Sequence, residues 1–327
     1  MSTAPVQRGA AILAAMITVT LVATVAAAAI ARQSSAIEVE AAERGRVQAQ
    51  WLLRGAMDWS RLLLRQDAQS SGAVDHLGEP WALPLRETKL SAFLAANGGV
   101  VDADASADTT DAYLSGALHD MQSKLNLRPF FATKAAVQGL VAGNPVQRLF
   151  ERLGLPQSEY RLLAQALGQV LDPEAGDTQA LRPQTLQDLA WLGVAASTIE
   201  ALEPYATLHE GISSVNINTA SAPVIWALVP EMAWSQAQAL VAARTHKHFA
   251  NLQQAQDTVP GVILPSGVFA LNSQFFSAYG QVRMQGIALE MQADLARTNT
   301  KVRTQRVQSA GIALPDAIGR NGTVFRD

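Results

Sequence analysis

An uncharged run of 22 residues, Ala10 to Ala31, constrains the fold of this chain more than any other feature. Nine residues precede the run, and Arg8 and Arg32 bound it. As a helix it would be ~33 Å long, enough to cross the hydrocarbon core of a bilayer. The alternative is a cleaved secretory signal with an A-x-A site at residues 27–29, but the apolar part of such a signal is normally only ~7–15 residues long. We therefore predict one membrane-spanning helix with its N-terminus in the cytoplasm.

The helical pattern continues beyond Arg32 as a stem. Apolar residues recur there at spacings of three and four, which indicates one face of an amphipathic helix, and proline is absent from Gln7 to Glu79. We predict a single helix from about Ala10 to Gln66; an ordinary anchor followed by a separate helix is the alternative. Small residues allow close helix–helix approach and large ones fill a groove against a sheet, so we expect burial on the chain's own sheet from Leu52 onward and an uncovered stem over residues 31–49. The stripe consists of Ala42, Gly45, Ala49, Leu52, Ala56, Trp59 and Leu63.

Composition excludes several classes of protein. Hydrophobic residues make up 49% of the chain and charged residues 16%, which argues against extensive disorder. The net charge of −3 leaves no excess of positive charge for a nucleic-acid backbone. With no cysteine, disulfides, thiol catalysis and cysteine-bound metals are excluded.

The rest of the chain alternates between two kinds of pattern. Residues 128–272 have helical spacing and many prolines, whereas strand-like sequence occurs at 99–101, 112–118 and 275–308. We predict an α+β fold in which the long N-terminal helix packs on a small antiparallel sheet. The sheet would combine first strands from residues 32–127 with C-terminal strands from 273–327. An all-α domain, 128–272, would be inserted between them, because neighbouring strand ends bring the two ends of an insertion together.

The leader and several internal segments resemble a known family. A short leader that ends in Arg8-Gly9 and runs into an apolar helix resembles a type IV prepilin or pseudopilin. Most such proteins carry Glu at the fifth mature position, which is Ala14 here, and the minor pseudopilin K family of type II secretion is known for this departure. Further segments are similar to that family in the same order: Asp75–Ala82 to its D-x-L-x-E-x-W-A stretch, Leu114–Leu127 with Asp120, Gln122 and Asn126, Val215–Ala220 to its V-N-x-N-T-A stretch, and Phe275-Phe276 with Gly280–Val282.

The resemblance implies a structural role in assembly and no enzymatic activity. It implies cleavage by a prepilin peptidase between Gly9 and Ala10, followed by N-methylation of Ala10. It implies a single-pass inner-membrane protein with a periplasmic C-terminal domain, which caps the pseudopilus tip together with the minor pseudopilins I and J. Other pseudopilins and the inner-membrane secretion platform would be further partners. The stem residues that we expect to meet partner stems are Ala14, Ala42, Gly45 and Ala49.

One segment of the predicted helical domain favours a different function. Asn216, Asn218, Thr219 and Ala220, followed by two helices, resemble a helix-hairpin-helix unit, also described as SAM-like. DNA binders of that kind have a Gly-rich turn whose N–H groups approach a phosphate. The turn here is Val229–Met232, with a proline and a glutamate, and residues 213–262 carry no net charge. A membrane-tethered DNA-binding protein of an uptake system is thus the alternative; otherwise we expect these Asn and Thr side chains to cap and brace helix ends.

Catalytic and metal signals are sparse. No catalytic motif occurs around the five histidines, and His246 and His248 are interpreted as solvated. The acidic stretch from Asp102 to Asp111 is interpreted as a solvated loop. Asp172, Glu174 and Asp177 lie where the family has an acidic, calcium-linked loop, so calcium is possible there, although the family's downstream Glu-Asp-Tyr is missing. No cofactor is required.

Overall fold

The computed structural model of the chain describes residues 8–70, 74–97, 112–131, 144–171, 182–212, 214–265, 267–284 and 286–313. The expected strand at 99–101 lies outside these residues. Both acidic stretches, Asp102–Asp111 and the one with Asp172, Glu174 and Asp177, lie outside them as well.

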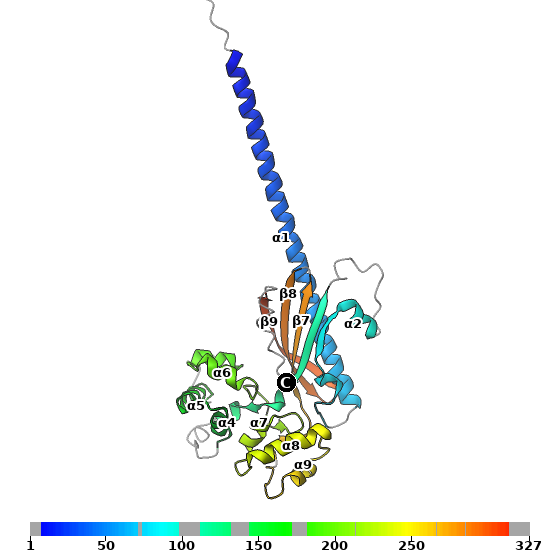
Figure 1. The fold of residues 1–327 in the computed structure, drawn as a ribbon, viewed down its shortest axis with the longest axis vertical. Helices are drawn as coiled ribbons and strands as arrows, with labels where there is room; N and C mark the ends of the chain where they lie inside the picture. The colour runs from blue at the N-terminus through cyan, green and yellow to red at the C-terminus, as the bar shows by residue number, and fades with distance from the viewer. Residues whose placement is uncertain are drawn as a thin grey trace, which may run out of the picture.

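A single helix, α1 (Arg8–Ser70), runs through 63 residues. The prediction of one continuous helix is therefore confirmed, and its end lies four residues beyond the predicted Gln66. The N-terminal half of α1 projects away from the rest of the molecule, and its C-terminal half lies along the sheet (Figure 1). Membrane-type sequence and stem thus share one helix axis.

A five-stranded antiparallel sheet packs against the stem. Its strand order is β1-β2-β7-β8-β9, so the two N-terminal strands lie beside three C-terminal ones. Asp120 at the end of β2 pairs with Phe276 near the start of β7, which brings the two ends of the intervening segment together. The sequence patterns did not predict β1, whose exposures do not alternate. The bounds are β1 (Leu85–Lys89), β2 (Tyr113–Asp120), β7 (Phe275–Met284), β8 (Ile287–Thr298) and β9 (Lys301–Ala313).

The segment between β2 and β7 is mostly helical, as its sequence predicts. It gathers at the end of the sheet that lies away from the projecting half of α1 (Figure 1). Two short parallel bridges, β3 (Leu125–Asn126) with β4 (Ala206–Thr207) and β5 (Val215–Asn216) with β6 (Phe269–Ala270), tie it together. Its helices are α4 (Pro145–Leu153), α5 (Gln157–Leu171), α6 (Ala196–Leu202), α7 (Ala222–Leu228), α8 (Trp234–His246) and α9 (Leu252–Thr258). Short 3-10 turns η3 (Met121–Ser123), η4 (Arg128–Phe130) and η5 (Gln187–Leu192) complete it, while η1 (Pro80–Ala82) and α2 (Leu90–Ala96) flank β1.

Buried apolar residues form two clusters. One draws its members from Leu125 to Phe269, within the helical segment. The other lies between α1 and the sheet and draws on α1, β2, β7, β8 and β9. The helical part therefore has a hydrophobic core of its own.

The face of α1 that packs on the sheet differs from the prediction. Ala49, Leu53, Met57 and Leu64 are buried, whereas the predicted Leu52 and Trp59 are only partly buried. Gly45 is also buried, so the packing begins one turn or more below Leu52. The expectation that Gly45 and Ala49 stay uncovered is wrong. The small residue Ala49 lies in the close contact of α1 with another surface, as expected, but that surface is the chain's own sheet and not a partner stem.

Candidate functional site

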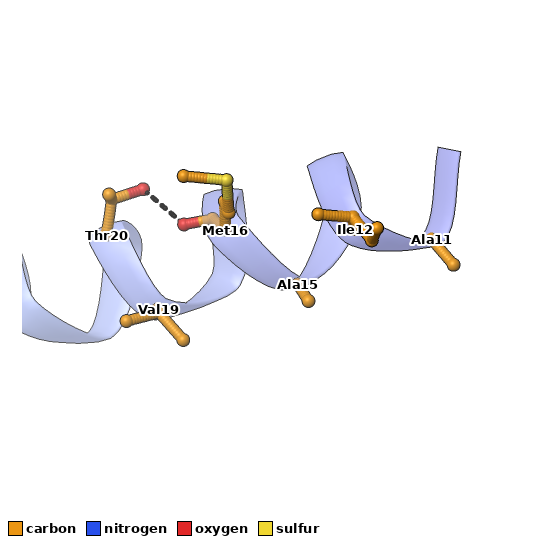
Figure 2. Close-up of a pocket in the computed structure, with 6 residues that line it drawn as sticks. All are labelled: Ala11, Ile12, Ala15, Met16, Val19 and Thr20. Carbon is orange, nitrogen blue, oxygen red and sulfur yellow. Dashed lines mark hydrogen bonds between the residues drawn. The ribbon is translucent and has the colours of Figure 1, made fainter. Parts of the chain in front are cut away.

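The first part of the candidate site is the projecting half of α1. Its most apolar stretch has a mean hydropathy of 2.3, and large side chains such as Ile12 (64% exposed) and Val19 (68% exposed) have no intramolecular cover. The hydroxyl of Thr20 donates to the Met16 carbonyl oxygen at 2.9 Å, as Figure 2 shows. Because its polar groups are satisfied within the helix, this segment fits a transmembrane anchor.

The predicted processing and stem residues divide between two environments. Gly9 and Ala10 lie in the first turns of α1. Ala14 and Ala42 are exposed and remain available to a partner. Gly45 and Ala49 are enclosed by the chain itself, as described above, and are not a free interface.

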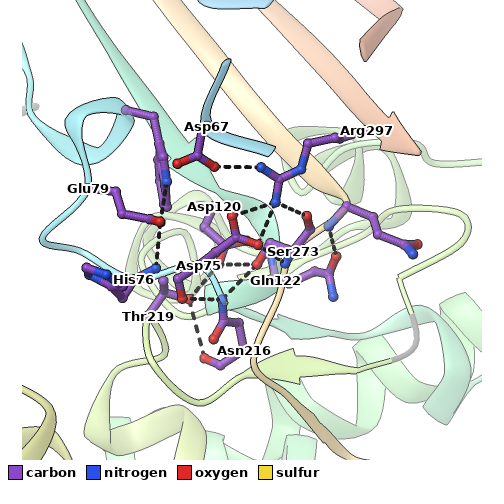
Figure 3. A network of polar contacts seen from close by, with 12 residues as sticks. Asp67, Asp75, His76, Glu79, Asp120, Gln122, Asn216, Thr219, Ser273 and Arg297 are labelled. Carbon is purple, nitrogen blue, oxygen red and sulfur yellow. Dashed lines mark hydrogen bonds and ion pairs between the residues drawn. The ribbon is translucent and has the colours of Figure 1, made fainter. Parts of the chain in front are cut away.

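The second part is a buried polar network where the sheet meets the helical segment (Figure 3). We call it the junction network. Three of the sequence segments that carry the family resemblance meet there, although they are far apart in the chain. Its members are Asp67, Asp75, Glu79, Asp120, Gln122, Asn216, Thr219, Ser273 and Arg297.

Arg297, at the end of β8, joins the sheet to the end of α1 and to the loop that follows it. Its Nη1 donates to Asp67 Oδ2 at 2.8 Å and its Nη2 to Asp75 Oδ1 at 2.5 Å. Nη2 also donates to the Ser273 carbonyl oxygen at 2.7 Å. Burial raises the pKa of Asp75, and the hydrogen bond and charge of Arg297 oppose this effect. A buried charge is tolerated only when it is paired and hydrogen-bonded, which is what this arginine provides.

Asp120 accepts three hydrogen bonds from three separate elements. Its Oδ1 accepts from the Gln122 backbone N–H at 2.7 Å. Its Oδ2 accepts from the hydroxyls of Thr219 at 2.5 Å and Ser273 at 2.6 Å. Burial raises the pKa of Asp120 to about 6 in spite of these bonds. One carboxylate therefore fastens the end of β2 to both sides of the helical segment.

The Asn and Thr residues of the helix-hairpin-helix-like segment serve the same junction. Asn216 donates to the Asp75 carbonyl oxygen at 3.1 Å and to Ser273 Oγ at 2.9 Å. The side chain of Asn218 donates to the Phe249 carbonyl oxygen and accepts from the Phe249 backbone N–H. Ala220 is fully buried. The expectation that these side chains cap helix ends is thus wrong. Instead, they form hydrogen bonds with buried polar groups of loops and strands. Leaving such a group unpaired costs more free energy than an ordinary helix cap contributes.

Sequence reasoning missed Asp67, Ser273 and Arg297. A signal existed for Arg297: along β8 the buried positions Leu289, Met291, Ala293 and Leu295 alternate, and the next position on that face is Arg297. A charge on an otherwise apolar strand face predicts a buried ion pair. Ser273 gave no such signal, since single serines are common in turns.

The hairpin turn between α7 and α8 is engaged within the domain. Arg148 of α4 donates to the carbonyl oxygens of Trp226 at 2.8 Å and Pro230 at 2.8 Å. Arg244 of α8 donates to the Ile217 carbonyl oxygen at 2.6 Å, and burial lowers the pKa of Arg244 to about 10. Arg244 of this unit and Arg148 of α4 therefore hold backbone carbonyl oxygens of the unit within the domain.

Comparisons with known proteins agree with these features. Residues 215–269 match the family described as type II secretion system (T2SS), protein K. A type II secretion system protein K from Pectobacterium carotovorum is 26% identical over 350 residues, covering 93% of this chain and 97% of the relative. The protein of the same name from Pseudomonas aeruginosa is 25% identical and covers 85% of each chain.

The fold has a solved counterpart. One chain in the crystal structure of the GspK–GspI–GspJ complex from the enterotoxigenic Escherichia coli type 2 secretion system superimposes with a TM-score of 0.61 at 18% identity, covering 83% of this chain and 98% of the other. A long apolar N-terminal helix packed on an antiparallel sheet, together with these matches, is what is expected of a pseudopilin of type II protein secretion. Within that class, the chain is similar to the type II secretion system protein K family.

Proposed function

We propose that this pseudopilin caps the tip of the pseudopilus and starts its assembly. The observation that carries the proposal is the uncharged run of α1 from Ala10 to Ala31, with Ala14 exposed where most pilins have Glu. A carboxylate inside an apolar helix bundle is expensive unless it pairs with a neighbouring N-terminal amine. A subunit without it can leave the membrane first, because it needs no subunit ahead of it.

The position of the helical domain supports an end location. It gathers at the far end of the sheet from the apolar half of α1 (Figure 1). A subunit that stacks above this one in a shaft would meet that bulk, whereas nothing lies above a tip subunit. The same domain has its own hydrophobic core, so it adds bulk without loosening the sheet.

The proposed partners are the minor pseudopilins I and J. The related solved chain crystallised in a complex named for GspK, GspI and GspJ, and the exposed side of α1 around Ala14 and Ala42 is available for partner stems. Other pseudopilins and the inner-membrane platform would follow in assembly. We place the protein in the inner membrane, with a cytoplasmic N-terminus that prepilin peptidase cleaves between Gly9 and Ala10, and with a periplasmic domain.

The helix-hairpin-helix-like, or SAM-like, segment is assigned a structural role within this proposal. The carbonyl oxygen of Pro230 in its turn and the side chain of Arg244 are used inside the domain, which argues against the DNA-binding alternative. A filter-binding assay tests the assignment. Duplex DNA should not bind below micromolar concentration, whereas tight binding with a steep salt dependence would favour the alternative.

Co-purification tests the proposed complex. The full chain is expressed with the I and J proteins of the same system and purified in detergent through a tag on J. We expect all three to elute together, with Ala10 as the methylated first residue of this chain. Recovery of J and I without this chain would contradict the proposed partners, and Met1 as the first residue would contradict the processing.

A further inference from the structure

Three carboxylates in the junction network lie close together in a buried place. They come from Asp67 at the end of α1 and from Asp75 and Glu79 in the loop before η1. Their residues are 7%, 2% and 4% exposed. One oxygen from each lies within 4.8 Å of the other two. Like charges this close in a buried place repel strongly unless cations compensate them.

Glu79 provides an independent indication of a ligand. Its Oε2 accepts from Trp81 Nε1 at 2.7 Å and from the His76 backbone N–H at 2.9 Å. Its Oε1 is buried and has no hydrogen-bond partner. A buried carboxylate oxygen without a donor is rare and calls for an explanation such as a bound ion.

Arg297 compensates only part of the charge. It is the cationic partner in the ion pairs that the structure describes for Asp67 and Asp75. Within the described residues, the ion pairs of Arg297 do not include Glu79, whose charge a divalent cation would compensate. Figure 3 shows Arg297 and Glu79 on opposite sides of the two aspartates. Since each carboxylate oxygen has two lone pairs, contact with Arg297 leaves the aspartates able to act as ligands.

We propose that Asp67, Asp75 and Glu79 form a binding site for a divalent cation, calcium in particular, that fastens the end of α1 to the loop before η1. All three donors are carboxylate oxygens, the ligands of a hard cation. Calcium has metal–oxygen distances of about 2.3–2.6 Å and accepts irregular geometry, so oxygens up to ~5 Å apart can share one ion, whereas magnesium demands a tighter octahedron. The site is distinct from the acidic loop of Asp172, Glu174 and Asp177, and it is independent of the proposed tip role.

The experiment uses the full chain in detergent after removal of metals with a chelator. Calorimetric titration with calcium chloride measures binding, and melting with and without calcium measures its effect on stability. The test variant is Glu79→Gln, which keeps an acceptor for Trp81 and His76 and removes the charge. The control carries Asp172→Asn, Glu174→Gln and Asp177→Asn together.

We expect calcium to bind and to raise the melting temperature of the wild type and of the loop control. Glu79→Gln should weaken calcium binding by ~10-fold or more, and magnesium should bind more weakly than calcium. Absence of binding in the wild type, equal binding by Glu79→Gln, or loss of binding in the loop control would overturn the proposal.

A second measurement does not depend on the folding of Glu79→Gln. Terbium, a luminescent substitute for calcium, should show emission excited through tryptophan, because Trp81 contacts Glu79. Calcium should displace this emission, and Trp81→Phe should reduce it severalfold. Emission that is unchanged in Trp81→Phe would place the ion elsewhere and contradict the site.

Discussion

Gly116 of β2 pairs directly with Gly280 of β7, and each residue lacks a side chain for a different steric reason. A β-carbon at residue 116 would lie 2.7 Å from the Tyr279 backbone oxygen. A β-carbon at residue 280 would lie 2.8 Å from the Met57 methyl group on α1. The absence of a side chain at Gly116 therefore allows β2 and β7 to pair closely. Its absence at Gly280 allows α1 to lie close to the sheet.

The glycine pair leads to a ranked prediction. Gly116→Val should lower the free energy of unfolding by about 1–3 kcal/mol, because the Tyr279 backbone cannot move aside alone. Gly280→Ala should cost less, since the end of the Met57 side chain can rotate away. Urea denaturation of the full chain measures both. Gly55→Ala is the control, because nothing lies within 4 Å of that position, and it should be neutral or stabilising. A larger cost for Gly280→Ala than for Gly116→Val would refute this ranking.

Arg297 should be among the most sensitive charged positions. Arg297→Met leaves the buried carboxylates of Asp67 and Asp75 without their cation, so we expect a loss of about 3–5 kcal/mol. Arg44→Met is a matched control, because the Arg44–Glu40 pair is exposed and such pairs contribute below about 1 kcal/mol. Denaturant unfolding compares the two variants. Similar small losses would show that the ion pairs of Arg297 are not a structural tie.

The stability cost of substituting a stem residue of α1 should depend on how deeply that residue is buried against the sheet. Leu64 is fully buried, so Leu64→Ala should cost about 2–5 kcal/mol. Trp59 is partly buried and packs edge-on against Phe93 at 5.7 Å, so Trp59→Ala should cost less than Leu64→Ala. Gly45→Leu should now lower the melting temperature, because Gly45 is buried in the monomer. An unchanged melting temperature for Gly45→Leu would restore the original expectation of an uncovered stem there.

Asp120 should give the junction a characteristic dependence on pH. Its pKa is raised from 3.8 to about 6, so between these values the folded state holds a proton that the unfolded state has lost. Stability from this group is therefore present below about pH 4 and is lost as pH rises through 6. As pH rises over that range, the wild type should lose on the order of 2 kcal/mol of unfolding free energy relative to Asp120→Asn. A difference that is flat, or that moves toward the wild type as pH rises, would contradict the raised pKa.

Sequence patterns predicted the long helix, the helical segment and the C-terminal strands because each depends on local periodicity. The phase of the stem was predicted less well: Leu52 and Leu53 are adjacent, and only the position of β7 decides which of them is buried. β1 was missed because its exposures do not alternate. The residues of the family-like segments, such as Asp75, Asp120 and Asn216, could be singled out from the sequence, but their meeting in one network could not. That meeting depends on chain separations of up to 230 residues, as between Arg297 and Asp67, which no local pattern encodes.

The central claim is that this protein occupies the end of the pseudopilus, and its position on the assembled fibre tests that claim most directly. Pseudopili assembled with a gold-labelled full chain, carrying the label in the helical domain, can be imaged by electron microscopy. Labelling of the shaft subunit is the control that every position on the fibre is accessible. We predict one label at a single end of each fibre. Labels spaced along the shaft would contradict the tip role, whatever partners the protein is found to bind.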